Sequence, residues 1–256
     1  MPVTGQWKNK PMPAIISLKN ITKYFEEDGK RLPVLENINL EIQAGEFFMM
    51  VGPSGCGKST ILRIMSGLEK SFSGEVILGN GIKQNDMSFV FQQFALLPWL
   101  TVFENVEMGL LAKNMDQKAR HSIVARELKQ FGLEKFAHVH PKDLSGGMRQ
   151  RVGIARALAT EPKIIFMDEP FSELDSFTAE ELRKELLEIW KARRPTIVMV
   201  THIVPEALEL ADRVAVLTAR PGRVERVLSN HLPRPRVMRS TDFFHMEDQL
   251  YHLIRP

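Results

Sequence analysis

Residues 52–60 have the types and spacing of a loop that holds a polyphosphate: Gly52, Pro53, Ser54, Gly55, Cys56, Gly57, Lys58, Ser59 and Thr60. Its glycines free the backbone, so that successive N–H groups can curve around an anion, and the helix expected next points its positive end at that anion. In this pattern the lysine reaches the β- and γ-phosphates, and the serine after it binds Mg²⁺. The loop predicts binding of ATP or GTP; the alternative is a glycine-rich turn that binds nothing.

Two carboxylates and an imidazole follow apolar runs further along the chain. Asp168 and Glu169 come directly after residues 164–167, and His202 comes shortly after residues 196–200. Because successive strand residues point to opposite sides, one carboxylate can face Mg²⁺ and the other an attacking water. The alternative is a pair of acids at the end of a surface strand, although burying carboxylates without a use is costly. His202 fits a core histidine and a functional one equally well.

Two further positions could contact a nucleotide. Gln92 ends the predicted strand at residues 87–91, where its amide could bind Mg²⁺ or a water on the metal. Tyr24 and Phe25 precede the polar loop at residues 26–31, where an exposed aromatic ring could stack on a base. Both rings fit a hydrophobic core as well. The residues alone leave these choices open.

A second anion site is predicted at residues 145–147. Ser145 is a favoured N-cap for the helix expected to follow, and Gly146 and Gly147 leave the first backbone N–H groups of that helix bare. The chain therefore has two places where a phosphate could meet backbone N–H groups.

The elements that must position these residues alternate strands with helices. Residues 47–51 predict a strand that leads into the phosphate loop, and residues 164–167 and 196–200 are apolar runs suited to buried parallel strands. Residues 15–51 are predicted as antiparallel strands, with Ile38, Leu40 and Ile42 alternating with polar residues before a turn at 43–46. Residues 74–78 predict another short strand.

The later part of the chain adds helices. Thr101 and Glu104 predict a capping box at the start of a helical stretch, and Thr178 and Glu181 predict another. An apolar stripe is expected to pack the first stretch: Val124, Leu128 and Phe131. Residues 213–228 predict two strands that turn at 220–223, and residues 246–254 predict a short terminal helix.

The composition is that of a globular protein with a sizeable core. Of 256 residues, 44% are hydrophobic, and 34 basic against 31 acidic residues give a net charge of +3, too balanced to predict nucleic-acid binding. The single cysteine, Cys56, favours a reducing compartment, and no apolar run long enough for a membrane span or a signal peptide is expected. Basic residues near the C-terminus are interpreted as solvated surface: Arg220, Arg223, Arg226, Arg234, Arg236 and Arg239.

In this order the motifs resemble the nucleotide-binding subunit of an ATP-binding cassette (ABC) transporter over residues 16–228. The loop at 52–60 looks like Walker A, residues 144–150 like the signature motif, and residues 164–168 like the Walker B strand. The resemblance implies that Gln92 is the Q-loop glutamine, Glu169 the catalytic glutamate and His202 the switch histidine. It also favours Phe25 over Tyr24 as the ring that stacks on the base.

Three less specific stretches resemble those of importers for nitrate, sulfonates and taurine: residues 96–99, 217–223 and 232–236. Some positions depart from the family pattern. Met148 replaces the commoner glutamine of the signature, Glu173 replaces a small residue of the D-loop at 172–175, and Ile203 and Pro205 follow the histidine. None of these replacements removes a chemical group that the family pattern supplies. The replacement at Glu173 leaves open how the subunits would communicate.

The fold implied is α/β: a P-loop NTPase core of the ABC ATPase type, with an N-terminal antiparallel β subdomain and an inserted helical subdomain at about 93–160. Residues 1–15 would be an extension, 16–230 the ATPase domain and 231–256 a tail with a short helix. The reaction implied is hydrolysis of ATP with Mg²⁺: Ser59, Asp168 and Gln92 bind the metal, Lys58 and His202 contact the γ-phosphate, and Glu169 orients or deprotonates water.

The partners implied are a second copy, with ATP between Walker A of one chain and the signature of the other, membrane-spanning permease subunits, and indirectly an extracytoplasmic solute-binding protein. The protein would then lie at the cytoplasmic face of the membrane. The alternatives are an exporter subunit, a soluble ABC ATPase and a regulator that only binds nucleotide. Soluble ABC ATPases usually carry two cassettes or a coiled-coil insertion, and a regulator would be expected to lose the acid that Glu169 supplies.

Overall fold

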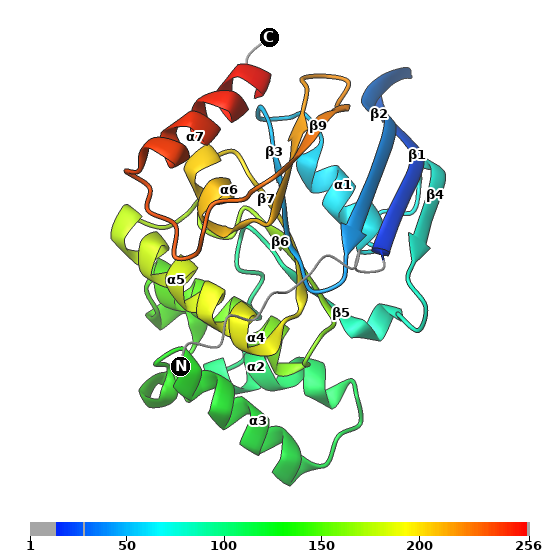
Figure 1. Cartoon of the computed structure of the whole chain (residues 1–256). Coiled ribbons are helices and arrows are strands. Elements are labelled where there is room, and N and C mark those ends of the chain that lie inside the picture. Colours follow the sequence, from blue (N-terminus) through cyan, green and yellow to red (C-terminus); the bar gives the residue numbers. More distant parts are fainter. Residues whose placement is uncertain (1–13, 28, 255–256) are drawn as a thin grey trace.

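The computed structural model describes residues 14–27 and 29–254, and a parallel sheet runs through their centre (Figure 1). In that part of the chain the central sheet has the order β5-β6-β7-β3-β8-β9, parallel throughout except for the pair β8 and β9. Its strands are β3 (Phe47–Val51), β5 (Met87–Val90), β6 (Ile164–Asp168), β7 (Thr196–Thr201), β8 (Arg213–Leu217) and β9 (Val224–Ser229). All residues of β3, β6 and β7 are buried, as expected for parallel strands covered on both faces.

An antiparallel sheet lies beside this core, in the order β2-β1-β4. Its strands are β1 (Ala14–Glu27), β2 (Lys30–Gln43) and β4 (Ser73–Leu78). The predicted alternation in β2 is confirmed, since Ile38, Leu40 and Ile42 are buried between exposed residues. The prediction of antiparallel strands up to residue 51 was wrong at its end. After the turn, the wholly apolar β3 joins the central sheet, where both of its faces are covered.

Two hydrophobic cores lie on opposite faces of the central sheet. One fills the space between the two sheets and contains α1 (Lys58–Met65), which Figure 1 places between β3 and the strands β1 and β2. The other packs the opposite face against helices: α2 (Val102–Leu111), α3 (Gln117–Gln130), α4 (Gly146–Ala159), α5 (Ser176–Arg193), α6 (Val204–Leu210) and α7 (Thr241–Ile254). Short 3₁₀ helices lie at Gln84–Asp86, Glu134–Phe136 and Pro141–Asp143.

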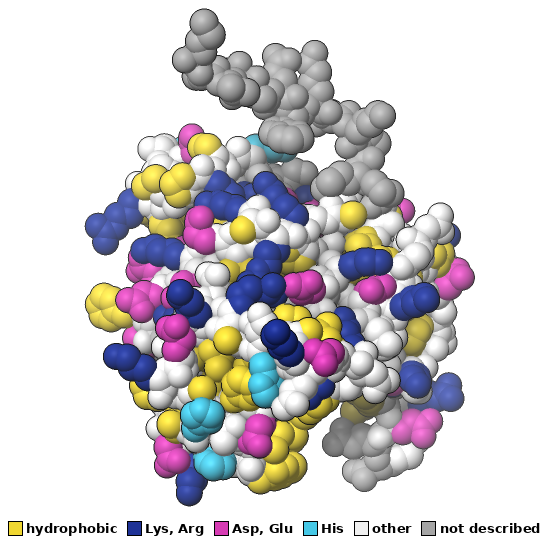
Figure 2. Space-filling view, turned by 90° about the horizontal axis from the view of Figure 1, so that it is seen from below, with side chains coloured by type: hydrophobic (Ala, Val, Ile, Leu, Met, Phe, Trp, Pro, Cys, Tyr) yellow, Lys and Arg dark blue, Asp and Glu magenta, His cyan; other side chains and the backbone are white. Residues whose placement is uncertain are grey.

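The helices α2, α3 and α4 gather at one end of the molecule. The capping box is confirmed: Thr101 Oγ1 accepts a hydrogen bond from Glu104 N, and a Glu104 carboxylate oxygen accepts one from Thr101 N at 2.7 Å. The predicted stripe is buried, with Val124, Leu128 and Phe131 in the core. Seen from this end, the surface carries charges of both signs, with apolar and histidine side chains gathered toward one edge (Figure 2).

The cap predicted for the later helix was wrong. The helix α5 begins at Ser176, and its N-cap is Asp175, whose carboxylate accepts hydrogen bonds from Phe177 N and Thr178 N. Thr178 instead lies in the first turn and donates its hydroxyl to Asp175. Aspartate stabilises a helix N-terminus at least as well as threonine does, so the helix begins after Asp175 and not after Thr178.

The segment after β9 packs against the core. Helix α7 starts at Thr241, five residues before the predicted position, and buries Phe243 and Leu250. Arg234 and Arg236 donate hydrogen bonds to the carbonyls of Leu210 and Glu209 at the end of α6, so these two arginines are not the solvated residues that the sequence suggested. Burial lowers the pKa of Arg236 to about 10. No helix in residues 14–27 and 29–254 combines the length and apolar character needed to cross a membrane.

The turn between β8 and β9 approaches the phosphate loop so closely that only glycine fits there. A Cβ atom on Gly222 would lie 2.0 Å from the carbonyl oxygen of Cys56. We expect Gly222→Ala to lower the free energy of unfolding by about 1–3 kcal/mol, because the backbone must move to relieve the overlap. The measurement is thermal unfolding, with a fall of several degrees.

Gly153→Ala is the matched control. A Cβ atom there would be 3.5 Å from the nearest heavy atom, an ordinary contact inside helix α4, so the substitution should leave the melting temperature unchanged or raise it. A Gly222→Ala protein that melts at the parent temperature would contradict the close approach.

Candidate nucleotide-binding site

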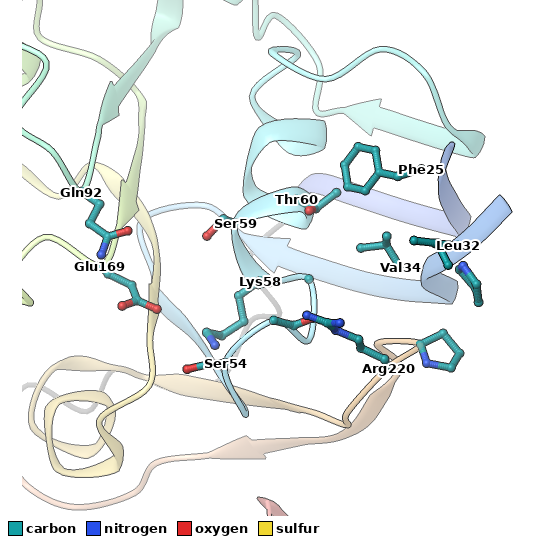
Figure 3. A pocket seen from close by; sticks show the side chains of 14 residues that line it. Phe25, Leu32, Val34, Ser54, Lys58, Ser59, Thr60, Gln92, Glu169 and Arg220 are labelled. Atoms are coloured by element: carbon teal, nitrogen blue, oxygen red, sulfur yellow. The ribbon is translucent and has the colours of Figure 1, made fainter. Parts of the chain in front are cut away.

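A cavity of about 720 Å³ opens between the phosphate loop, strands β1 and β2 and the turn after β8 (Figure 3). Its lining includes most of the predicted site residues and some that were not predicted: Phe25, Leu32, Pro33, Val34, Ser54, Gly55, Gly57, Lys58, Ser59, Thr60, Gln92, Glu169, Arg220 and Pro221. Glu169 and Gln92 lie at one end of the cavity and Phe25, Leu32 and Val34 at the other. A nucleotide would fit this arrangement, with its phosphates toward the polar end and its base toward the apolar end.

The phosphate loop connects β3 to α1 through backbone conformations that glycine allows. Gly55 and Gly57 have φ values of 75° and 96°, and a Cβ atom on Gly57 would lie 2.4 Å from Leu35 Cδ2. Cys56 is buried against the loop, and burial raises the pKa of its thiol. The loop therefore needs these small residues at these positions.

Lys58 is the first residue of α1 and is buried. Its Nζ atom donates to the carbonyl oxygens of Gly52 and Pro53 at 2.9 and 3.0 Å. The loop thus holds the ammonium group inside its own curve, where a phosphate would meet it together with the backbone N–H groups at the start of α1.

Ser59 and Asp168 form the candidate metal position. The Ser59 hydroxyl donates to Asp168 Oδ1 at 2.7 Å, and Arg63 Nη2 lies 3.9 Å from the other carboxylate oxygen. Burial raises the pKa of Asp168, while the serine hydrogen bond and Arg63 act in the opposite direction. A hydroxyl and one carboxylate fit Mg²⁺, which binds few protein oxygens and completes its shell with phosphates and water. No group of three or more His, Cys, Asp or Glu side chains that could hold a metal occurs among the described residues.

Glu169 follows β6 in a left-handed backbone conformation, with φ of 43°. Its carboxylate lies 2.9 Å from His202 Nδ1, and its N–H donates to the carbonyl of Val200. Strand alternation was expected to make the side chains of Asp168 and Glu169 face opposite ways, but β6 ends at Asp168, so Glu169 is not a strand residue. The left-handed backbone conformation of Glu169 turns its side chain into the cavity. Strained backbone conformations of this kind are typical of functional sites.

Gln92 lines the cavity near Glu169, and its amide nitrogen lies 3.4 Å from the Ser172 hydroxyl. Phe94 and Ala95, which come directly after Gln93, have positive φ values. Arg156 of α4 donates hydrogen bonds to the carbonyls of both residues. The loop that carries Gln92 is therefore attached to the same helix that begins at Ser145 and Gly146.

At the other end of the cavity, Phe25 is 46% exposed, with the buried Lys23 ammonium 4.8 Å from the ring centroid. Tyr24 is equally exposed but does not line the cavity. Neighbouring strand residues face opposite ways, which explains why only one of the two rings is presented to the cavity.

Eight predicted residues do not line this cavity: Gly52, Pro53, Cys56, Asp168, His202, Ser145, Gly146 and Gly147. Ser145 caps α4 by accepting a hydrogen bond from Met148 N, as predicted, but Ser145, Gly146 and Gly147 are not part of the lining. A Cβ atom on Gly147 would meet Thr178 Cγ2 at 2.5 Å, so this glycine is also required for packing against α5. Within one chain the two predicted anion sites are separate.

The sequence reasoning missed a buried network behind Glu169 and His202. Glu206 accepts a hydrogen bond from the Thr201 hydroxyl at 2.7 Å and lies 3.4 Å from Arg183 Nη1, and burial raises the pKa of its carboxyl. The Arg183 guanidinium lies 5.9 Å from the centroid of the Phe171 ring, two residues after Glu169. Helices α5 and α6 thus support both loops that carry the paired side chains, a contact that no local sequence pattern marks.

Arg220 was interpreted only as solvated surface; it is exposed, but it also lines the cavity. It follows β8, which is parallel to β3, so the two strands end at the same edge of the sheet. That position was a usable signal, because ligands of such sheets bind outside the carboxyl ends of the strands.

The fold and the cavity define a P-loop ATPase. A family profile described as ABC transporter matches residues 35–172. The chain is 45% identical over 251 residues to the "Uncharacterized ABC transporter ATP-binding protein MJ0412" of Methanocaldococcus jannaschii, covering 97% of this chain and 94% of that protein. It is 41% identical over 231 residues to the aliphatic sulfonates import ATP-binding protein SsuB of Bacillus cereus, covering 89% and 91%.

Among solved structures, the chain resembles the ATP-binding cassette MJ0796, a dimer in a post-hydrolysis state bound to ADP and Pi. The TM-score is 0.75 at 39% identity, over 84% of this chain and 99% of that one. The chain belongs to the ABC transporter family and is an ATP-binding ATPase of this type, as the motifs predicted.

The position of Phe25 predicts a binding defect without a defect in chemistry. Phe25→Ala should raise the KM for ATP about tenfold and change kcat little, because stacking on a base is worth about 1–3 kcal/mol and the base does not react. Selectivity among nucleotide bases should be poor in the parent protein. The measurement is steady-state phosphate release with ATP and GTP.

Tyr24→Ala is the matched control, since Tyr24 is equally exposed and lies outside the cavity lining. A Phe25→Ala variant with an unchanged KM, or a Tyr24→Ala variant with the larger effect, would show that the wrong ring was chosen.

Proposed function

We propose that this protein is the ATP-hydrolysing subunit of an ABC importer, and that the residues assigned from the motifs carry the reaction. The observation that supports this most is the meeting of Lys58, Ser59 and Glu169 in one cavity, with Asp168 bonded to Ser59 and His202 to Glu169. A cavity with this set can bind a triphosphate, hold its metal and direct a water.

In the proposed reaction Lys58 leaves the loop carbonyls to contact the β- and γ-phosphates, and the N–H groups at residues 55–60 surround the chain of phosphates. Ser59 and Asp168 would hold Mg²⁺, with Gln92 near it, and the bound ion would supply positive charge beside the phosphates. Gly52, Pro53, Cys56 and Thr60 complete the loop.

The remaining step is the attack of water on the γ-phosphate. The Glu169 carboxylate orients this water or accepts its proton, and His202 contacts the γ-phosphate while its Nδ1 atom stays beside Glu169 Oε2. The left-handed backbone at residue 169 keeps the carboxylate at the end of the cavity where the γ-phosphate must lie.

We also propose that the active unit is a head-to-tail homodimer. The N-terminus of α4, with Ser145, Gly146 and Gly147, does not line the cavity of its own chain, so a second copy is needed to bring it to the γ-phosphate. The dimeric cassette bound to ADP and Pi supports this arrangement.

The importer assignment rests on the sulfonate import proteins that this chain resembles. Partners would be membrane-spanning permease subunits and, indirectly, an extracytoplasmic solute-binding protein, with the chain peripheral at the cytoplasmic face. The solute would be nitrate, a sulfonate or taurine. Residues 16–230 would form the ATPase domain, with a helical subdomain at about 93–160, an extension at 1–15 whose residues 1–13 lie outside the described part, and a tail at 231–256.

A permease contact is proposed at Trp99. This side chain is 69% exposed, while the neighbouring Leu96 packs against the core, so of these two apolar residues Trp99 is the one available to a partner. The fully buried Asn105 holds the loop beneath it, accepting from Leu97 N and donating to the carbonyls of Leu97, Leu100 and Thr101. A large apolar ring on a loop fixed in this way is suited to insert between partner side chains.

A photo-cross-linker at position 99 should capture a membrane-spanning subunit in complexes assembled in native membranes. The control position is Leu68, a 56% exposed apolar residue beside the end of α1, which should give no such product. If position 99 captured no membrane partner, or no more than position 68, this contact would be wrong.

The catalytic assignment predicts the behaviour of Glu169→Gln. The amide keeps the shape of the side chain but cannot accept a proton, so hydrolysis should fall by about 10²- to 10⁴-fold while ATP binding is retained. Since hydrolysis would allow the two copies to separate, this variant should accumulate as a dimer with Mg-ATP. Phosphate release and size-exclusion light scattering, with and without Mg-ATP, measure both effects.

Three further variants make the experiment specific. Glu225→Gln, at an exposed position of β9, should behave as the parent. Lys58→Ala should bind ATP weakly and stay monomeric, and adding Ser145→Arg to Glu169→Gln should abolish the trapped dimer, with circular dichroism confirming that α4 is still folded. Parent-rate hydrolysis by Glu169→Gln would refute its role, and an inactive monomer would refute the dimer.

A further inference from the structure

Arg220 places a cation in the nucleotide cavity that the phosphate-binding motif does not include. Its side chain extends from the turn after β8 toward the phosphate loop, where its Nε atom lies 3.3 Å from the carbonyl oxygen of Gly55 (Figure 3). A Cβ atom built on Gly55 would be only 2.7 Å from Arg220 Nη2, so the guanidinium lies directly against the loop.

The turn that carries Arg220 is held firmly in place. Gly222 N donates to the carbonyl of Val34, and Glu36 N donates to the carbonyl of Gly222, so the turn is joined to β2. Across the turn, Thr218 N donates to the carbonyl of Arg223, and Arg223 N donates to the Thr218 hydroxyl. The Arg223 side chain also reaches β2, with its Nη2 atom 2.8 Å from Glu36 Oε2. The cation is therefore presented by a turn that is bonded to both sheets.

The charge of Arg220 has no carboxylate partner within 4 Å among the described residues, in contrast to Arg223 in the same turn. Its neighbours in the cavity are Leu32, Val34 and Pro221, which offer no anion. A guanidinium carries several N–H donors, and one backbone carbonyl uses only part of them. An oxyanion in the cavity would meet the remaining donors.

We propose that Arg220 binds the part of the nucleotide's phosphate chain that lies nearest the ribose. Figure 3 places Arg220 on the side of Leu32 and Val34, away from Glu169 and Gln92, where the γ-phosphate must lie. The contact rests on the assignment of this cavity to ATP. Because it is made to phosphates that stay in place during hydrolysis, it strengthens the binding of ATP and ADP alike and contributes little to the chemical step.

A merely structural role for Arg220 is the competing explanation, since its hydrogen bond to Gly55 could simply support the loop. The two roles differ in their dependence on charge. A contact to phosphate is a charge-assisted interaction that salt weakens, whereas a hydrogen bond to a backbone carbonyl inside the protein responds much less to salt.

The test is equilibrium binding of Mg-ADP to Arg220→Gln, Arg220→Lys and the parent protein at several salt concentrations, without turnover. We expect Arg220→Gln to bind ADP roughly tenfold more weakly, with a shallower salt dependence and an unchanged melting temperature. Arg220→Lys should recover part of the affinity and the salt dependence. In steady-state assays Arg220→Gln should raise KM and leave kcat nearly unchanged.

Arg226→Gln is the matched control, because it removes the same charge from an exposed position on β9 outside the cavity lining. Parent-like ADP affinity in Arg220→Gln, or an equal loss in Arg226→Gln, would overturn the proposal. So would a loss of affinity that keeps the parent's salt dependence and lowers the melting temperature. A parent protein that binds ADP but fails to hydrolyse ATP would count against the proposed function and not against this contact.

Discussion

The nucleotide site depends on the parallel pairing of three buried strands. In the register of this sheet Val51 is opposite Thr201, and Asp168 is opposite Val200, so β3, β7 and β6 end within one residue of the same level. The phosphate loop, Glu169 and His202 begin where these strands stop. A slip in register by one residue would move the end of one strand by about 3.3 Å relative to its neighbours, and with it the loop that begins there. The pairing is therefore what sets the distances in the site, including the 2.7 Å hydrogen bond between Ser59 and Asp168, which lie 109 positions apart.

Much of this arrangement could be predicted because its signals are local. The phosphate loop, the buried strands and the cap at Ser145 each follow from a few neighbouring residues. The errors arose where distant contacts decide the outcome. Residues 47–51 are as continuously apolar as residues 164–167, which favours a strand buried on both faces, but the turn at 43–46 suggested a hairpin, and only the distant partners β7 and β8 decide which sheet the strand joins. Similarly, the left-handed backbone of Glu169 is fixed by its N–H bond to Val200, more than thirty positions away.

The cavity gathers charged groups that would be costly to bury alone. Asp168 has Ser59 and Arg63 beside it, Glu169 has His202, and the Lys58 ammonium is held by two carbonyl oxygens. Behind them, Glu206 and Arg183 support the loops of His202 and Glu169 from α5 and α6. These contacts hold the groups in place while the cavity is empty, and in the proposed reaction Lys58 would exchange its two carbonyl partners for phosphate oxygens.

The residues of the site differ in how they are held, and the difference matches their proposed roles. Lys58, Ser59 and Asp168 belong to a buried helix start and a buried strand, so their positions are set by the central sheet. Gln92 instead belongs to a loop whose backbone is bonded to Arg156, on the same helix that starts with the signature glycines. The loop that carries Gln92 is thus bonded to the helix that we propose meets a second copy, whereas the groups proposed to hold the metal and the phosphates belong to the central sheet and α1.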